Sequence, residues 1–349
     1  MRQLLILSPH RLWPVWTNPP NPLEPDRERT FRILATMGYS YQRIDPFRSP
    51  VNPFASAHSV LSALDPARAL RVLFFHRRAD VVFCYYESAA LLILLLRRVF
   101  FFHAKVVVYD IGVGGSWRLR DIILRRVLPR ADMLLPLGYN QTTKLLEMGA
   151  RPRTIHPVLD ATDCDFFSDV EDKPDGYILA VGDDISRDFL TLLKASKGLK
   201  YEIVIRSKTS SGADWSNTNV RFIRQRLSAK DYQKMIAGAV LVVLPLHPST
   251  HAGGITTLLE AMSSGRAIVV SNSPGLGDYL QDGKTCYVVP PGDPVALRKA
   301  IERLLADHVL RKTLGANARR FVVENCSPQA EAIRFAKALG RLGVSEHFS

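Results

Sequence analysis

Short apolar runs that alternate with helical patterns constrain the fold of this chain more than any other feature. The runs lie at 4–8, 81–86, 105–110 and 133–137, and then at 177–182, 201–206, 220–223, 241–246, 267–271 and 286–290. Each is nearly continuous in apolar residues, as expected of strands that are buried on both faces. Amphipathic helical patterns separate them. This alternation predicts an α/β protein with parallel sheets that are covered by helices on both sides.

The pattern occurs twice, on either side of the polar stretch DVEDKPDG at 169–176. A chain of 349 residues is also long for a single core. We therefore predict two doubly wound, Rossmann-like domains at 1–168 and 169–325, followed by a C-terminal helix within 326–349. Two sheets of this type that face each other place a cleft at the carboxyl ends of their strands, where ligands of open α/β sheets bind.

The positive charge is unevenly distributed along the chain. The formal net charge is +13, and residues 1–150 contain twenty Lys and Arg against eleven Asp and Glu. Eighteen of those twenty cations are Arg, whose planar guanidinium suits phosphate oxygens. Such a half fits phosphorylated substrates or anionic lipid headgroups, or it is simply a solvated basic surface. No nucleic-acid recognition motif accompanies the charge, so we expect no nucleic-acid partner.

Several classes of protein are disfavoured by what the sequence lacks. The first apolar run is not followed by G-x-G-x-x-G, which disfavours a dinucleotide dehydrogenase. The four cysteines have no paired spacing, which disfavours a zinc site or a disulfide framework. No apolar run is long enough to span a membrane, and the N-terminal run is typical of a strand. We therefore expect a cytoplasmic protein.

The stretch THAGGITTLLEAM at 250–262 is the strongest candidate for a ligand site. Ile255 and Leu258 begin an apolar helical stripe, and two glycines precede it. The first amides of a helix lack internal partners and attract anions, and glycines allow a phosphate to approach the backbone. This segment therefore predicts either a diphosphate site or a glycine-rich turn that only starts a helix.

The segment from LVVLPLHPST at 241–250 to PGDPVALRKA at 291–300 resembles the donor-binding domain of GT-B glycosyltransferases, especially glycosyltransferase family 4. The likeness includes EAM at 260–262, the following strand and a Gly-rich turn, and it extends from about 130 to 330. It implies a GT-B fold with a central cleft, in which the C-terminal helix crosses back to the N-terminal domain. The implied activity is transfer of a sugar from a nucleotide-diphosphate sugar, without a metal or another cofactor.

The resemblance also implies roles for individual residues. Glu260 matches the carboxylate that accepts hydrogen bonds from the donor ribose. Arg187 stands where a phosphate-binding cation is expected, or it only forms a surface salt bridge with Asp183 or Asp184. Arg206 and Lys208 are weaker candidates for the phosphate-binding role. The turn that meets the diphosphate or sugar corresponds to Gly253, Gly254, Ile255 and Thr256.

Two positions depart from the family pattern. Ala252 replaces the first Glu of the paired-Glu motif, which leaves the contacts to the donor sugar open. The neighbouring His251 either substitutes for it or is structural. Asp278 replaces the Glu that is expected after the Gly-rich turn.

Candidates for the acceptor side lie in the N-terminal half. Asp110 ends an apolar run and is the first candidate for a general base, while Glu87 and His10 are weaker ones. If Asp110 only caps the following Gly-rich loop, its removal will cost stability and leave transfer intact. Trp13 and Trp16, in a proline-rich loop, either stack on a sugar or pin the loop to the core.

Apolar stretches with Arg clusters at 72–78, 91–103 and 118–130 are typical of segments that lie on an anionic membrane, although core helices with charged ends share this composition. We therefore expect an acceptor that is a lipid-linked sugar or a polysaccharide or glycolipid intermediate, with the protein peripheral on the inner membrane face. The alternatives are a nucleotide-sugar epimerase or hydrolase of the same fold, and a catalytically silent sugar-nucleotide-binding protein.

Overall fold

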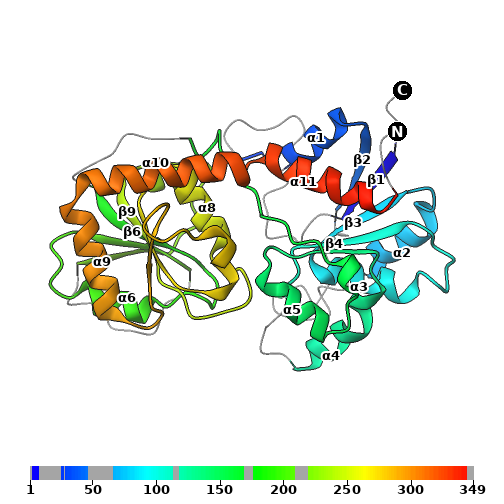
Figure 1. The fold of residues 1–349 in the computed structure, drawn as a ribbon, viewed down its shortest axis with the longest axis horizontal. Coiled ribbons are helices and arrows are strands. Elements are labelled where there is room, and N and C mark those ends of the chain that lie inside the picture. Colours follow the sequence, from blue (N-terminus) through cyan, green and yellow to red (C-terminus); the bar gives the residue numbers. More distant parts are fainter. Residues whose placement is uncertain are drawn as a thin grey trace. The chain divides into compact units, whose positions relative to one another are not determined.

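The computed structural model describes residues 2–7, 25–26, 28–45, 66–112, 118–168, 176–208 and 219–343. These residues form two compact units (Figure 1). Unit 1 contains Glu28–Val158 with the first strand and the residues from Ala332 onward, and unit 2 contains Leu159–Glu331. Each unit is built on a parallel sheet with helices on both faces, so the α/β prediction is confirmed.

The sheet of unit 1 has the strand order β2-β1-β3-β4-β5. Its strands are β1 (Arg2–Leu7), β2 (Tyr39–Ile44), β3 (Val81–Tyr85), β4 (Lys105–Tyr109) and β5 (Met133–Leu135). All neighbours are parallel. The apolar runs predicted four of these strands and missed β2. That strand lies at the sheet edge and pairs only with β1, so its sequence YSYQRI needs no continuous apolar run.

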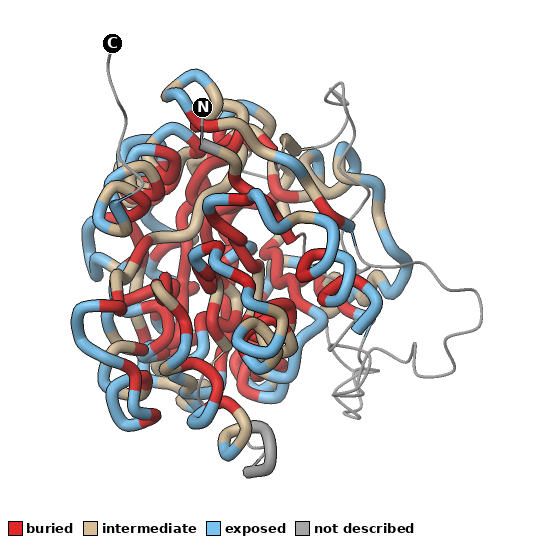
Figure 2. Tube along the Cα trace, turned by 90° about the vertical axis from the view of Figure 1, so that its right-hand side faces the viewer, coloured by how far each residue is buried: buried red, intermediate tan, exposed pale blue. Residues whose placement is uncertain are grey.

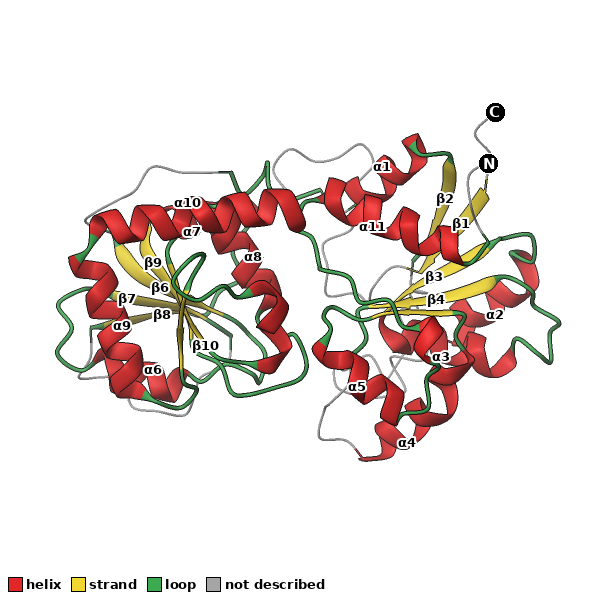
Figure 3. Cartoon of the chain, viewed as in Figure 1, coloured by secondary structure: helices red, strands yellow, loops and turns green. Residues whose placement is uncertain are grey.

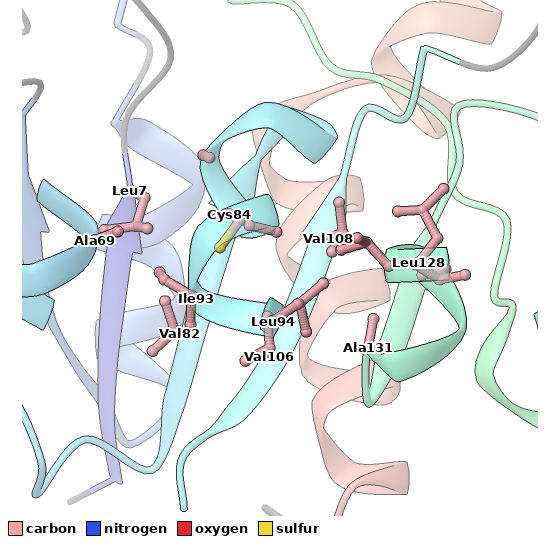
Figure 4. Packing of buried hydrophobic residues seen from close by; sticks show 14 of the residues in the cluster. Leu7, Ala69, Val82, Cys84, Ile93, Leu94, Val106, Val108, Leu128 and Ala131 are labelled. Atoms are coloured by element: carbon pink, nitrogen blue, oxygen red, sulfur yellow. The ribbon is translucent and has the colours of Figure 1, made fainter. Parts of the chain in front are cut away.

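Helices cover both faces of this sheet (Figure 3). One face packs against α2 (Pro66–Phe75), α3 (Tyr86–Leu96), α4 (Arg118–Val127) and α5 (Asn140–Glu147). Figure 4 shows this core, in which Val82 and Cys84 of β3 and Val106 and Val108 of β4 point toward the helices. Alternate residues of each strand therefore belong to this layer, as the pleat requires.

The opposite face of the sheet is covered by α1 (Arg29–Thr36) and α11 (Pro328–Arg341). Phe335 of α11 is fully buried, and its ring lies 5.0 Å from that of Phe83 and 5.2 Å from that of Tyr109. The ring of Phe31, from α1, contacts those of Phe83 and Phe335. The C-terminal end of the chain thus completes the core of the N-terminal unit.

The sheet of unit 2 has the order β11-β10-β9-β6-β7-β8, again with all neighbours parallel. The strands are β6 (Tyr177–Val181), β7 (Ile203–Arg206), β8 (Val220–Ile223), β9 (Ala239–Leu244), β10 (Ile268–Ser271) and β11 (Tyr287–Val289). The helices are α6 (Phe189–Ser196), α7 (Ala229–Ala237), α8 (Ile255–Ser263), α9 (Pro294–Ala306) and α10 (His308–Asn325). β9 is buried along its whole length. Figure 2 shows buried stretches of the chain toward the inside and exposed stretches at the periphery.

In the part of the chain that the structure describes, no helix combines the length and hydrophobicity needed to cross a lipid bilayer. α3, with the sequence YESAALLILLL, is the most apolar surface-layer helix, and it has only 11 residues. A spanning helix needs about 20.

Candidate active site

The sheet of unit 2 reverses its winding between β6 and β9, which are neighbours in the sheet. In such sheets, ligands bind outside the carboxyl ends of the strands at this reversal. Here the segments that follow the two strands are joined. The amide of Asp188 donates to the Pro245 carbonyl at 2.9 Å, and the amide of His247 donates to the Ser186 carbonyl at 2.8 Å. These bonds bring Arg187 and the glycine turn at 253–254 to the same place.

Arg187 is a buried cation at this reversal, with 9% of its surface exposed. Its Nε donates to the Val181 carbonyl at 2.7 Å, and one terminal nitrogen lies 3.3 Å from the Asp184 carboxylate. Burial lowers the pKa of Arg187 from its ordinary value, and the charge of Asp184 opposes this effect. A buried guanidinium gains the most from an additional anion, since water does not solvate it.

Two glycines make room for this guanidinium. A Cβ on Gly182 would lie 1.9 Å from the Arg187 Nε, and a Cβ on Gly254 would lie 2.9 Å from a terminal nitrogen of Arg187. Gly254 also has φ +92°, a conformation that favours glycine. Gly254 is therefore explained by the fit of Arg187 against the start of α8, whereas a Cβ on Gly253 would meet the Ser186 side chain instead.

The backbone amides at the start of α8 fall into two groups, those that donate to a nearby carbonyl and those that face no acceptor among the described residues. The amide of Gly253 donates to the His251 carbonyl at 2.8 Å, and that of Ile255 donates to the Ala252 carbonyl at 3.1 Å. Among the described residues, no acceptor faces the amides of Gly254, Thr256 and Thr257. The donors that α8 offers to an anion are therefore those of Gly254, Thr256 and Thr257, beside the Arg187 guanidinium.

Glu260 lies one turn further along α8 and is 6% exposed. The Tyr232 hydroxyl, from α7, donates to its Oε2 at 2.9 Å. Burial, and then the negative charge of Glu260, raise the pKa of Tyr232 well above its ordinary value, so the phenol stays protonated as a donor. A carboxylate accepts about four hydrogen bonds, so this bond orients Glu260 without exhausting its acceptor capacity.

Gly253 and Ile255 of the predicted donor side are buried, whereas the remaining predicted side chains are more exposed than Arg187 and Glu260: Arg206, Lys208, His251 and Thr256. Arg206 and Lys208 both face Asp183, at 2.8 Å and 3.9 Å between charged atoms. His251 is exposed and precedes the buried Ala252. Thr256 is exposed in the first turn of α8. The structure thus separates the buried Arg187 and Glu260 from a more solvated set.

Unit 1 places two of the predicted acceptor-side residues at adjacent strand ends. Asp110 follows β4 with φ +54°, and Glu87 lies in the first turn of α3, after β3. Glu87 is 9% exposed and accepts a hydrogen bond from the Gly112 amide at 3.1 Å, so it fixes the loop that Asp110 begins. A left-handed conformation at a non-glycine residue is strained and is often found at functional sites. His10, Trp13 and Trp16 lie outside the described residues.

Sequence reasoning missed three side chains that shape this site. Tyr232 orients Glu260, Thr257 accepts from Arg187 at 3.4 Å, and Ser186 fills the space beside Gly253. None of them is separated from its partner by a helical or strand period, so no local pattern could indicate the contacts.

Comparison with known proteins finds similarity over the same part of the chain. Residues 161–307, most of unit 2, match the family model described as glycosyl transferases group 1. The predicted resemblance is confirmed. The matched range contains Arg187, the glycine turn and Glu260.

Individual relatives are similar over a limited part of the chain. An uncharacterized glycosyltransferase of Methanocaldococcus jannaschii is 31% identical over 113 residues, which is 32% of this chain and 29% of that protein. The lipopolysaccharide core biosynthesis mannosyltransferase LpcC of Rhizobium leguminosarum is 36% identical over 91 residues, 26% of each protein. The chain thus matches less than a third of the length of these relatives.

Solved structures are similar over nearly the whole chain. Sucrose-phosphate synthase from Thermosynechococcus elongatus has a TM-score of 0.76 at 17% identity, over 98% of this chain and 99% of that one. The Anabaena protein HepE in complex with UDP has a TM-score of 0.69 at 13% identity, over 97% and 100%. At these identities the likeness shows the fold, and that fold is the predicted GT-B arrangement of two Rossmann-like domains.

Proposed function

We propose that this protein is a glycosyltransferase that moves a sugar from a nucleotide-diphosphate sugar to an acceptor hydroxyl. The observation that carries this proposal is the buried Arg187 guanidinium at the reversal of the unit 2 sheet, beside the amides of Gly254, Thr256 and Thr257, which face no acceptor among the described residues. Fixed positive charge at this point would stabilise the diphosphate that leaves during transfer. These groups would do so without a metal, and Glu260 would hold the donor ribose.

The relatives suggest the kind of product. One relative is named for lipopolysaccharide core biosynthesis, and another, from Staphylococcus aureus, is named for capsular polysaccharide biosynthesis. Two HepE structures contain UDP-glucose, or UDP and glucose. We accordingly propose an acceptor that is a polysaccharide or glycolipid intermediate, including a lipid-linked sugar, at the cytoplasmic face of a membrane.

On the acceptor side, we propose Asp110 as the general base that takes the proton from the acceptor hydroxyl. Asp110→Asn tests this role cleanly, because asparagine tolerates the left-handed conformation and keeps the side-chain shape. Transfer should fall by about a hundredfold or more, the typical contribution of acid–base catalysis, while nucleotide affinity is kept. Full activity of the variant would leave Asp110 with the structural role alone.

The donor site is tested by a thermal-shift screen of nucleoside diphosphates and their sugars, because a bound ligand raises the unfolding temperature. Glu260→Gln keeps an acceptor for Tyr232 but removes the charge, and it should weaken binding by roughly 1.5 kcal/mol, about tenfold. Glu302→Gln, an exposed carboxylate on α9, is the matched control. Equal affinity of the two variants would contradict the donor site.

The same assay separates transfer from its alternatives. A transferase should hydrolyse the donor only slowly until an acceptor is added. Rapid turnover without an acceptor would identify an epimerase or hydrolase instead, and nucleotide binding with no turnover under any condition would identify a silent binding protein.

A further inference from the structure

Unit 1 exposes large apolar side chains where α2 and α3 end. Phe75 is 81% exposed at the end of α2, and Val99 and Phe101, after α3, are 68% and 77% exposed. The two helix ends are adjacent, because the Phe74 ring meets the Phe100 ring edge-on at 4.8 Å between centroids. These apolar residues therefore share one surface of unit 1.

Basic residues outnumber acidic ones in the segments that carry these apolar side chains. Residues 66–105 contain seven Lys and Arg against two Asp and Glu. One of the acids, Glu87, is buried and bonded to the Gly112 amide. Arg71, Arg78 and Arg98 are exposed, and within the described residues no carboxylate lies within ion-pair distance of them. Among the residues that the structure describes, no acid therefore neutralises these three cations.

Phe101 is held there against its conformational preference. Its φ is +50°, although bulky side chains avoid this region. The amide of Phe102 donates to the Arg97 carbonyl at 2.8 Å, which is the helix-ending bond that normally accompanies a glycine at the position of Phe101. Neither burial nor backbone geometry favours an aromatic residue at this position. We therefore attribute Phe101 to a contact that this surface makes with a partner.

We propose that the α2–α3 surface, formed by Arg71, Phe75, Arg78, Arg98, Val99 and Phe101, docks on an anionic lipid bilayer. Apolar side chains enter the boundary between headgroups and acyl chains, while the arginines bind lipid phosphates. We commit to a bilayer because the exposed charges of this surface are all positive, which matches the negative surface potential of an anionic leaflet. The purpose of this docking, access to a lipid-linked acceptor, rests on the proposed function, but the binding itself needs no donor site.

The test is sedimentation with vesicles of phosphatidylcholine and phosphatidylglycerol, and with vesicles of phosphatidylcholine alone, at low and high salt. The protein should pellet with the anionic vesicles at low salt, and much less under the other conditions. Arg78→Gln with Arg98→Gln should lower partitioning about tenfold or more. Lys312→Gln with Arg320→Gln, two exposed cations on α10, removes the same charge from unit 2 and should have little effect.

Apolar variants complete the test. Val99→Ser should weaken vesicle binding, whereas Val309→Ser, at a position 73% exposed on α10, should not. Phe101→Gly should weaken binding without lowering the unfolding temperature, which distinguishes lost docking from lost folding. The proposal is overturned if the unaltered protein does not pellet with anionic vesicles, or if the α10 variants reduce pelleting as much as the α2–α3 variants.

A second copy of this chain is the remaining alternative to a bilayer as the occupant of the α2–α3 surface. A concentration-dependent dimer that Val99→Ser dissociates, in protein that does not bind vesicles, would assign the surface to a second copy and overturn the proposal. Because pelleting is measured without nucleotide, loss of the donor site in Glu260→Gln should leave it unchanged. Failure of docking and failure of the proposed function are therefore distinguishable.

Discussion

The two units share a parallel-sheet plan, and a group of buried arginines in unit 2 contrasts with a group of exposed arginines in unit 1. In unit 2, Arg187, Arg266 and Arg311 are at most 9% exposed, and each donates to backbone carbonyls. In unit 1, Arg71, Arg78 and Arg98 are exposed beside apolar side chains. Buried and bonded cations have fixed positions and suit a defined phosphate, whereas exposed ones suit a diffuse anionic surface. Net charge alone does not distinguish these two uses.

The units also differ in how their cores are completed. The core of unit 2 comes from one continuous stretch, Leu159–Glu331, apart from a short N-terminal segment. Unit 1 depends on α11, from the far end of the chain, whose Phe335 completes an aromatic cluster with Phe31, Phe83 and Tyr109. Part of the core of unit 1 therefore depends on a helix that is distant in sequence from the strands it covers.

The largest expected effect is on the stability of unit 1 when the contribution of α11 to its core is removed. Phe335→Ala should lower the free energy of unfolding of unit 1 by about 3–5 kcal/mol, because it removes a fully buried ring from a packed cluster. Ile333→Ala, at a position 53% exposed on the same helix, is the control and should change little. Urea unfolding followed by signals from each unit is the measurement. An equal loss of stability in unit 2 would show that the units do not unfold separately.

The next effect sharpens the contrast between buried and exposed cations within unit 2. Arg187→Gln should weaken nucleoside-diphosphate binding by roughly 1.5–3 kcal/mol, about ten- to a hundredfold, because it removes a desolvated charge. Arg206→Gln should cost less, since Asp183 already holds that side chain. Titration calorimetry compares the two. A greater loss of affinity in Arg206→Gln would move the phosphate site to the Asp183 cluster.

A smaller effect concerns the exposed surface of unit 1. Phe101→Gly should raise the free energy of unfolding by up to about 1 kcal/mol, because glycine adopts a positive φ without strain. Phe101→Ala removes the ring but keeps the strained backbone, so it should bring no such gain. Thermal unfolding of the two variants is the comparison. A loss of stability in Phe101→Gly would mean that the ring packs usefully on unit 1.

The smallest effect is a pH dependence at the end of α11. Arg341 donates to the Nδ1 of His156 at 2.7 Å, and burial, followed by the charge of Arg341, lowers the pKa of His156. The neutral ring is therefore favoured in the folded state. This contribution is present above the ordinary histidine pKa of about 6.5 and is lost as the pH falls through the lower folded value.

His156→Gln should accordingly cost roughly a few tenths of a kcal/mol at about pH 7.5 and less at about pH 5.5, since the ring is partly solvated. His103→Gln, at an exposed position of the same unit, is the control. The measurement is urea unfolding at both pH values. A larger cost at the lower pH would reverse the assignment of the neutral ring.

Local sequence pattern was sufficient for most of the fold. The apolar runs predicted ten of the eleven strands found among the described residues, because strands buried on both faces need continuous apolar residues whatever their neighbours are. The pattern did not predict the edge strand β2, because in the described part of the chain this strand has a partner on one side only. Likewise, Gly254 and the apolar stripe that follows it predicted the start of α8, since helix ends and helical periodicity are properties of consecutive residues.

The sequence by itself thus determined two parallel sheets, an anion-attracting helix start in the second, and an arginine excess in the first. Only the tertiary structure decided which arginines are buried. It placed Arg187 in the space left by Gly182 and Gly254, bonded Tyr232 to Glu260, and brought Phe335 to the N-terminal sheet. The physical reason is that these contacts join residues far apart in the chain. Their partners are set by strand order and by the burial of whole faces, which no local period encodes.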